Sequence, residues 1–254
     1  MSPVRSPVLA AVVALVALTA CAAPMHPAAR PHAAAVEAAP PCQERELVVL
    51  VHGMGRTPLS MLPMAVALRR EGYEVLNFGY SSYGPSVAQL GSKLAAEVRA
   101  RRDDGPMRRV HFVGHSLGNI IVRWMLAYER PDALGRVVML APPNQGSRLA
   151  DRLEGALGWL LEPLSEVTTD SLSTARRLPP PEEVEFAILA GDRDGKVSVA
   201  ETFLAGAREH RVVPSRHTFI MLRPSVVEMT GRFLSGGTFD ESDGNVAPAS
   251  ACAD

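Results

Sequence analysis

Short apolar runs alternate with amphipathic segments through the middle of the chain. Residues 47–51, Leu-Val-Val-Leu-Val, form a continuous apolar run of the kind that a parallel strand covered on both faces requires. Further strands are predicted at 73–80, 110–113, 136–141, 184–190 and 211–213. Amphipathic patterning predicts helices at 59–70, 86–102, 117–129, 199–207 and 224–234. The alternation predicts an α/β fold with a mostly parallel central sheet and helices on both faces.

The two ends of the chain differ in composition from this central part. Arg5 precedes an apolar run that is too short to span a bilayer comfortably and is typical of a secretory signal peptide at residues 1–20. Residues 21–43 are rich in alanine and proline, and residues 236–254 in glycine, serine and alanine, so we expect a tether and a flexible tail. The folded domain is therefore expected at residues 44–235.

The predicted signal peptide ends in Leu18-Thr19-Ala20-Cys21, which resembles a bacterial lipobox. The resemblance implies that Cys21 is lipidated and becomes the mature N-terminus, anchored in the cell envelope at the periplasmic or outer side of the outer membrane. An ordinary signal peptide that contains a cysteine is the alternative. No later segment reaches about 18 consecutive apolar residues, so we expect membrane contact through the lipid anchor.

The two remaining cysteines, Cys42 and Cys252, flank the predicted domain. An exported protein meets a compartment that permits disulfides, so the two thiols are candidates for a bridge. Such a bridge would close a long loop and stabilise the fold by at most about 5 kcal/mol. Free thiols in the two tails are the alternative.

Composition and charge exclude several classes of protein. The chain has 254 residues, of which 47% are hydrophobic and 21% charged, which is ordinary for a globular domain and not for a disordered one. A formal net charge of −1 gives no field that would attract nucleic acid. His111 and His115 are four residues apart, but on a predicted strand and turn instead of one helical face, so they do not indicate zinc. No metal and no organic cofactor is expected.

The clearest chemical motif is Gly114-His115-Ser116-Leu117-Gly118, between a predicted strand and a predicted helix. A serine in this context sits on a sharp, strained turn, and the two glycines permit the turn and let helix and strand approach closely. The helix N-terminus supplies backbone N–H groups and positive dipole beside the hydroxyl. The motif therefore predicts that Ser116 is a nucleophile.

Four segments of the chain resemble the α/β-hydrolase superfamily and, within it, bacterial lipases and esterases. They are 51–55 (Val-His-Gly-Met-Gly), 114–118, 141–147 (Ala-Pro-Pro-Asn-Gln-Gly-Ser) and 194–198 (Asp-Gly-Lys-Val-Ser). The resemblance covers about residues 46–235 and implies an oxyanion hole formed by the backbone N–H groups of Met54 and Leu117. It also implies that His52 orients the loop, and that the catalytic residues follow in the order serine, acid, histidine.

This order leaves two histidines as the base, His210 and His217. His210 directly precedes a predicted strand, whereas His217 lies in the loop after it, where an imidazole can reach a serine at the carboxyl edge of the sheet. The acid is expected after the strand 184–190, where Asp192 and Asp194 are the candidates. Asp194 is favoured because Asp194-Gly-Lys-Val resembles the acid loop of the family, and Asp192 remains the alternative.

The stretch from about residue 148 to 181 interrupts the strand–helix alternation. Its leucines recur at spacings of three and four, on one face of a helix: Leu149, Leu153, Leu157, Leu160, Leu161 and Leu164. This apolar face either packs onto the core or belongs to a small helical lid that lines an acyl pocket or meets lipid. The sequence leaves both interpretations open.

The resemblance implies a serine hydrolase that cleaves carboxylic esters with apolar acyl groups through an acyl-enzyme. A lipase is favoured over a short-chain esterase, because the His-Gly-x loop resembles that of enzymes accepting medium to long acyl chains. The expected partners are an ester or lipid substrate and the membrane, and not nucleic acid. The alternatives are acyl transfer or thioester hydrolysis with the same residues, and a binding lipoprotein that retains the fold without activity.

Overall fold

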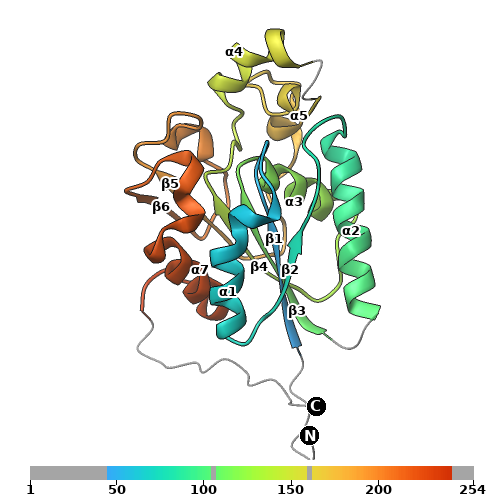
Figure 1. The fold of residues 1–254 in the computed structure, drawn as a ribbon, viewed down its shortest axis with the longest axis vertical. Coiled ribbons are helices and arrows are strands. Elements are labelled where there is room, and N and C mark those ends of the chain that lie inside the picture. Colours follow the sequence, from blue (N-terminus) through green and yellow to red (C-terminus); the bar gives the residue numbers. More distant parts are fainter. Residues whose placement is uncertain (1–44, 104–106, 159–161, 242–254) are drawn as a thin grey trace, which may run out of the picture. The chain divides into compact units, whose positions relative to one another are not determined.

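A computed structural model describes residues 45–103, 107–158 and 162–241 (Figure 1). All strand pairs in it are parallel and form one six-stranded sheet in the order β2-β1-β3-β4-β5-β6. The strands are β1 (Arg45–Val51), β2 (Glu74–Phe78), β3 (Met107–His115), β4 (Leu134–Leu140), β5 (Phe186–Gly191) and β6 (Glu209–Val213). In the sheet, β2 lies on one side of β1, and β3 with the later strands lies on the other side. The strand order therefore reverses between β1 and β3, and binding crevices form at the carboxyl ends of such a pair of strands.

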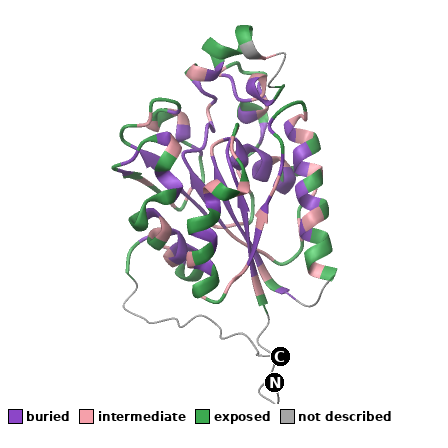
Figure 2. Cartoon of the chain, viewed as in Figure 1, coloured by how far each residue is buried: buried purple, intermediate pink, exposed green. Residues whose placement is uncertain are grey.

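Helices cover both faces of this sheet, as the sequence predicts (Figures 1 and 2). One layer contains α2 (Val87–Asp103) and α3 (Leu117–Tyr128), and the other contains α1 (Leu62–Arg70) and α7 (Pro224–Gly236). Alternate residues of β1 face opposite layers: Leu47, Val49 and Val51 join the core under α2 and α3, whereas Val48 and Leu50 join the core under α1 and α7. The apolar run in β1 is therefore buried on both sides, and the predicted α/β-hydrolase architecture is confirmed.

The insertion forms three short helices, α4 (Arg148–Leu157), α5 (Glu162–Ser165) and α6 (Thr174–Arg177), instead of one leucine-striped helix. Ser147 caps α4 by accepting a hydrogen bond at its hydroxyl from the Ala150 N–H, at 3.3 Å. In Figure 1, α4 and α5 lie beyond the carboxyl ends of the strands. The insertion therefore stands at the edge of the sheet where the reversal in strand order places a binding crevice.

A buried arginine attaches the end of the insertion to the core. The Arg123 side chain, on α3, is 2% exposed and donates hydrogen bonds to the carbonyl oxygens of Ala175 at 3.0 Å, Leu178 and Pro179. It also donates to Asn144 Oδ1 at 3.2 Å. Burial lowers the pKa of Arg123 to about 10, so the guanidinium stays charged at neutral pH. A buried charge that is held by several carbonyls fixes this part of the insertion against α3.

Two predicted helices differ from the observed elements. The segment predicted as a helix at 199–207 contains only one 3₁₀ turn, η2 (Val199–Thr202), because the chain becomes extended at Phe203, with φ −59° and ψ 137°. The helix predicted at 59–70 divides into the 3₁₀ helix η1 (Pro58–Met61) and α1. A third 3₁₀ helix, η3 (His217–Leu222), begins at a residue that the sequence places in a loop.

The folded domain extends beyond residue 235, where the sequence analysis ended it. Gly237 closes α7 in the left-handed conformation, with φ 77°. The chain then turns back, and Phe239 is fully buried with its ring centroid 5.4 Å from that of Phe233. Asp240 pairs with Arg211 on β6 at 2.8 Å. Residues that were assigned to a flexible tail therefore complete the core under α7.

Several predictions fall on residues outside the described ranges. They concern the signal peptide at 1–20, the tether with Cys21, and the candidate disulfide between Cys42 and Cys252. Across the ranges that the structure does describe, no helix combines the length and the apolar character that a membrane crossing needs.

Replacing Phe239 with alanine is expected to lower the free energy of unfolding by about 3–4 kcal/mol, because the cavity left behind adds to the lost burial. Urea denaturation followed by circular dichroism measures this change. Phe203→Ala is the matched control, since Phe203 is 55% exposed, and should change stability by less than about 0.5 kcal/mol. Equal losses in the two variants would contradict a core role for Phe239.

Candidate active site

Ser116 occupies the sharp turn between β3 and α3. Its backbone has φ 52° and ψ −124°, a conformation that side chains other than glycine rarely adopt and that costs about 1–3 kcal/mol. The Ser116 N–H donates to the Leu140 carbonyl oxygen at 2.9 Å. The Asn119 side-chain amide donates to the carbonyl oxygens of Ser116 and Leu140, both at 3.1 Å. The strained turn is therefore held from both sides, by β4 and by the first turn of α3.

The two glycines of the motif are required by lack of space. A Cβ atom on Gly114 would lie 2.3 Å from Asn119 Oδ1, and one on Gly118 would lie 2.3 Å from the Val51 carbonyl oxygen. Val51 ends β1, so Gly118 is the residue that lets α3 begin in contact with that strand. The close approach predicted from the sequence is confirmed.

The structure brings Ser116, His217 and Asp194 into one chain of hydrogen bonds. The distance from His217 Nε2 to Ser116 Oγ is 2.9 Å, and that from His217 Nδ1 to Asp194 Oδ2 is 2.7 Å. The side chains of His217 and Asp194 are 7% and 0% exposed. The second carboxylate oxygen of Asp194 accepts the N–H groups of Lys196 and Val197 at 2.8 and 2.9 Å, which fixes the carboxylate toward the imidazole.

The alternative acid, Asp192, has a different set of contacts. Its Oδ1 atom accepts the Ser215 N–H at 3.0 Å and lies 3.3 Å from the Arg193 guanidinium. Asp192 therefore supports the turn that precedes His217 and does not contact the imidazole. The other candidate base, His210, is hydrogen-bonded through Nε2 to the Thr202 hydroxyl at 2.9 Å.

Met54 and Leu117, the expected oxyanion donors, both line the same cavity as Ser116. Met54 follows β1, and Leu117 is the first residue of α3. The loop that carries Met54 is packed tightly onto Ser116: a Cβ atom on Gly53 would lie 3.1 Å from Ser116 Cβ. Residues of two separate elements therefore line the space around one hydroxyl.

His52 supports the loop that carries Met54. Its ring stacks on that of Tyr80 with centroids 4.1 Å apart, and the Tyr80 hydroxyl donates to the His52 carbonyl oxygen at 2.6 Å. Desolvation lowers the pKa of His52, so its imidazole stays neutral. The Gly55 N–H donates to Ser82 Oγ at 3.0 Å. His52 thus has the loop-orienting position that the resemblance implied.

His115 is a site residue whose contact the sequence analysis missed. It is 2% exposed, and its Nε2 donates to the His217 carbonyl oxygen at 3.0 Å. A carbonyl only accepts, so Nε2 carries the proton. Burial, with the nearby His217, lowers the pKa of His115 well below its usual range. The sequence signal was a histidine between Gly114 and Ser116, but its hydrogen-bond partner lies 102 residues later in the chain.

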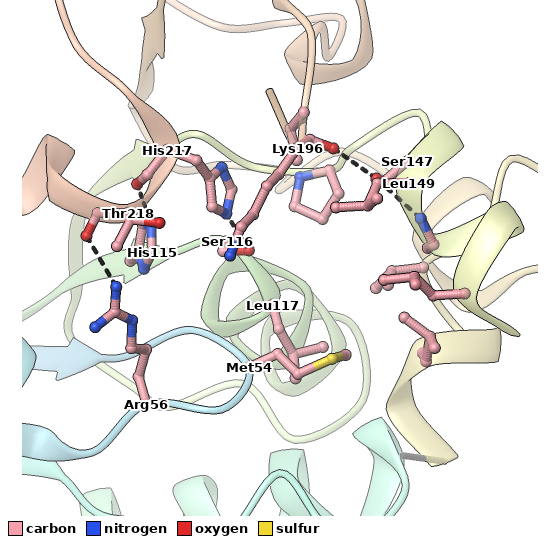
Figure 3. Close-up of a pocket in the computed structure, with 16 residues that line it drawn as sticks. Met54, Arg56, His115, Ser116, Leu117, Ser147, Leu149, Lys196, His217 and Thr218 are labelled. Atoms are coloured by element: carbon pink, nitrogen blue, oxygen red, sulfur yellow. Dashed lines mark hydrogen bonds between the residues drawn. The ribbon is translucent and has the colours of Figure 1, made fainter. Parts of the chain in front are cut away.

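A cavity of about 150 Å³ opens over Ser116 (Figure 3). Much of its wall is aliphatic: Met54, Leu117, Leu149, Leu153, Leu164 and Val167. Three of these residues belong to the leucine stripe of the insertion. Leu164 is buried, whereas Leu153 is 36% exposed. Leu160 and Leu161 of the predicted stripe lie outside the described ranges. The described part of the stripe both packs the insertion down and lines the cavity, so neither of the two interpretations excludes the other.

Arg56, Lys196 and Thr218 also line this cavity, and the sequence analysis assigned none of them to the site. Arg56 donates through Nη2 to the Thr218 carbonyl oxygen at 3.3 Å. Groups of three or more histidine, cysteine, aspartate or glutamate side chains arranged to hold a metal ion are absent from the described ranges.

The lowered pKa of His115 makes stability depend on pH. Below about pH 6.5 the unfolded chain protonates this imidazole and the folded protein does not, so the unfolded state binds more protons and the free energy of unfolding falls as the pH falls. His52 and His111, whose pKa values are also lowered by burial, act in the same direction. Above pH 6.5 the contribution is fully present.

The variant His115→Gln, whose amide can still donate to the His217 carbonyl, should flatten this acid dependence. The slope of unfolding free energy against pH below 6.5 is expected to decrease by up to about 1.4 kcal/mol per pH unit. Urea denaturation at a series of pH values measures the slope, with His32→Gln in the predicted tether as the control. An unchanged slope would mean that folded His115 takes up a proton.

Comparison with known proteins shows similarity to two lipases and an esterase. A triacylglycerol lipase of Pseudomonas fragi is 34% identical over 85 residues, which is 33% of this chain and 29% of that lipase. The mature form of a Bacillus licheniformis lipase superposes with a TM-score of 0.59 at 22% identity, over 73% of this chain and 89% of the other. A Pyrococcus furiosus esterase gives 0.57 at 21% identity, over 75% and 81%.

These solved structures share the fold, and the family model covers the domain. The model that describes the alpha/beta hydrolase family matches residues 48–234, which include most of β1, the turn at Ser116 and η3 with His217. The chain belongs to the alpha/beta hydrolase family.

Proposed function

We propose that the protein is a serine hydrolase of carboxylic esters, a lipase or esterase that prefers apolar acyl groups. The observation that carries the proposal is the continuous hydrogen-bond chain from Ser116 Oγ through His217 to Asp194, which opens into an aliphatic cavity. Nucleophile, base and orienting carboxylate within hydrogen-bond reach are the requirement for covalent ester hydrolysis.

The mechanism follows from the order of these contacts. His217 Nε2 removes the proton of Ser116 Oγ as the oxygen attacks the ester carbonyl carbon. Asp194 accepts the Nδ1–H of His217, holds that tautomer and stabilises the imidazolium that forms. The N–H groups of Met54 and Leu117 donate to the oxyanion, and each such donor lowers the barrier by about 3–4 kcal/mol.

The second half of the reaction reuses the same imidazole. The imidazolium of His217 returns its proton to the alcohol oxygen, the C–O bond breaks and the acyl group remains on Ser116. A water molecule then loses a proton to His217 and attacks the acyl carbon, which releases the carboxylic acid. The wall formed by Leu149, Leu153 and Leu164 supports a medium to long acyl chain, because burial of each CH₂ group stabilises binding by about 0.8 kcal/mol.

We propose further that Cys21 is lipidated and anchors the enzyme in a bacterial envelope. The support is the Leu-Thr-Ala-Cys sequence at 18–21 and the alanine- and proline-rich stretch that follows it. A largely extended stretch over residues 22–41 would reach roughly 60 Å. That length would let the domain work on lipids beyond the headgroup layer of its own membrane.

Ser116→Ala should lower kcat for p-nitrophenyl octanoate by about 10⁴- to 10⁶-fold, because no other group in the cavity can replace the nucleophile. The circular dichroism spectrum should stay unchanged, since alanine keeps the Cβ atom and the backbone contacts of the turn. A loss of only about tenfold would exclude Ser116 as the nucleophile.

Exchanging each aspartate for asparagine separates their roles. Asp194→Asn is expected to reduce kcat by about 10⁴-fold, since the amide favours the wrong tautomer of His217. Asp192→Asn retains an oxygen that can accept the Ser215 N–H and should leave kcat within about threefold. Steady-state kinetics of the two purified variants test this, and the opposite ranking would reassign the acid to Asp192.

Cys21→Ser should release the protein from the membrane fraction of an expressing bacterium, because the lipid attachment site is lost. Cys42→Ser is the control and should remain in the membrane fraction. Immunoblots of soluble and membrane fractions give the readout. Membrane retention of the Cys21 variant would refute the proposed anchor without affecting the proposed chemistry.

A further inference from the structure

Two cationic side chains, Arg56 and Lys196, line the cavity beside the Ser116 hydroxyl (Figure 3). No aspartate or glutamate is among the described residues that line it. The Asp194 side chain, behind His217, is fully buried and already bound to that imidazole. The aliphatic cavity of a proposed lipase thus has an edge with two positive charges that its own wall does not neutralise.

Neither Arg56 nor Lys196 forms an ion pair with a carboxylate within the described ranges. Arg56 is half-buried and donates to the Thr218 carbonyl oxygen, which uses one of the five N–H donors of a guanidinium. Lys196 is exposed, and in Figure 3 its side chain extends from the loop after β5 toward Ser116. The charges of both residues contribute to the lowered pKa of His115, after burial and His217. Their field therefore reaches the centre of the site.

Lys196 also lines an adjoining hollow, whose charged residues are Arg148, Arg152, Lys196, Asp194 and Glu201. The Asp194 carboxylate is bound to His217 and to two backbone N–H groups. The Glu201 carboxylate accepts the N–H groups of Arg148 and Ser198 and the Ser198 hydroxyl. Both acidic groups are therefore engaged, whereas the three basic side chains form no ion pair within the described ranges.

Arg56 and α4 lie on different sides of the nucleophile. Arg56 contacts the residue after His217, whereas Leu149 belongs to α4 on the opposite side in Figure 3. The Lys196 side chain starts from the loop beside Leu149 and extends toward Ser116. In the proposed mechanism the alcohol leaves with the proton of His217, so the alcohol part of the ester lies on the imidazole side. The acyl chain then lies against α4.

We propose that Arg56 and Lys196 form a subsite for an anionic group on the alcohol part of the ester. The preferred substrate is then an acyl ester whose alcohol carries a phosphate or a carboxylate, such as an acyl glycerophosphate, and not a neutral glyceride. This inference rests on the proposed ester hydrolase function and adds a substrate class to it. A guanidinium fork and an ammonium group together bind such oxyanions through charge-assisted hydrogen bonds.

The test compares two esters that differ by one phosphate, monooctanoyl glycerol and monooctanoyl glycerol phosphate, both kept below their critical micelle concentrations. The wild-type enzyme should show a kcat/KM at least about tenfold higher for the phosphate ester, because the charged group is held beside two cations. The preference should shrink from about 0.05 M to about 0.5 M NaCl, because salt screens partly exposed charges.

Lys196→Gln is the decisive variant, because within the described ranges the Lys196 ammonium forms no hydrogen bond or ion pair, and only its backbone N–H contacts Asp194. It should reduce kcat/KM for the phosphate ester by about tenfold, chiefly through KM, and leave the neutral ester within about twofold. Lys196→Arg should retain most of the preference. Arg70→Gln, which removes an exposed charge at the end of α1, is the matched control and should change neither ester.

Arg56→Gln should act in the same direction as Lys196→Gln, and the double variant should prefer neither ester. An equal fall for both esters in both single variants would overturn the proposal, because the cations would then act on the triad itself. Octanoyl glycerate, with a carboxylate on the alcohol, tests whether the subsite selects phosphate or any anion. A higher kcat/KM for either anionic ester than for the neutral ester supports an anionic subsite.

Two outcomes separate this proposal from the one on which it rests. Turnover that depends on Ser116 but is equal for the neutral and the anionic esters would overturn the subsite and keep the hydrolase. Absence of any turnover that depends on Ser116 would overturn both. A higher kcat/KM for the p-nitrophenyl half-ester of suberic acid than for p-nitrophenyl octanoate would place the anion on the acyl side. That result would contradict an orientation with the acyl chain against α4.

Discussion

The turn that holds Ser116 at positive φ is the constraint on which the rest of the site depends. It is possible only where β3 and β1 run side by side and α3 starts in contact with the end of β1, which the missing side chain of Gly118 permits. A larger residue there would push α3 away from Val51 and move the Leu117 N–H away from Met54. The strain of the turn is offset by packing and by the two hydrogen bonds of Asn119.

The imidazole reaches this turn from a distant part of the chain, and several contacts hold its backbone. Asp192 binds the Ser215 N–H, His115 donates to the His217 carbonyl, and Arg56 donates to the carbonyl of the next residue. These contacts come from the end of β3 and from two loops at the carboxyl edge of the sheet. Such redundancy holds the imidazole within hydrogen-bond distance of the serine, and the proposed mechanism requires this preorganisation.

The insertion gives the site its asymmetry. Its leucine stripe is divided between burial and the cavity, and Arg123 attaches its far end to α3 through three carbonyl groups. Arg56 lines the cavity from the loop after β1, away from Leu149, and the Lys196 side chain extends toward Ser116 from the loop after β5. Under the proposed function, an apolar wall and two cations beside one hydroxyl suit an amphiphilic ester with a defined orientation.

The sequence by itself determined the features that depend on local patterns. Short continuous apolar runs predicted the six strands, helical spacing predicted most helices, and Gly114 and Gly118 indicated the turn at Ser116. The tertiary structure decided which aspartate contacts His217, where the leucine stripe divides, and that Phe239 closes the core. These outcomes depend on distances between residues far apart in the chain, which no local pattern encodes. The neighbourhood of Arg56 and Lys196 likewise exists only after β1 and β5 lie in one sheet.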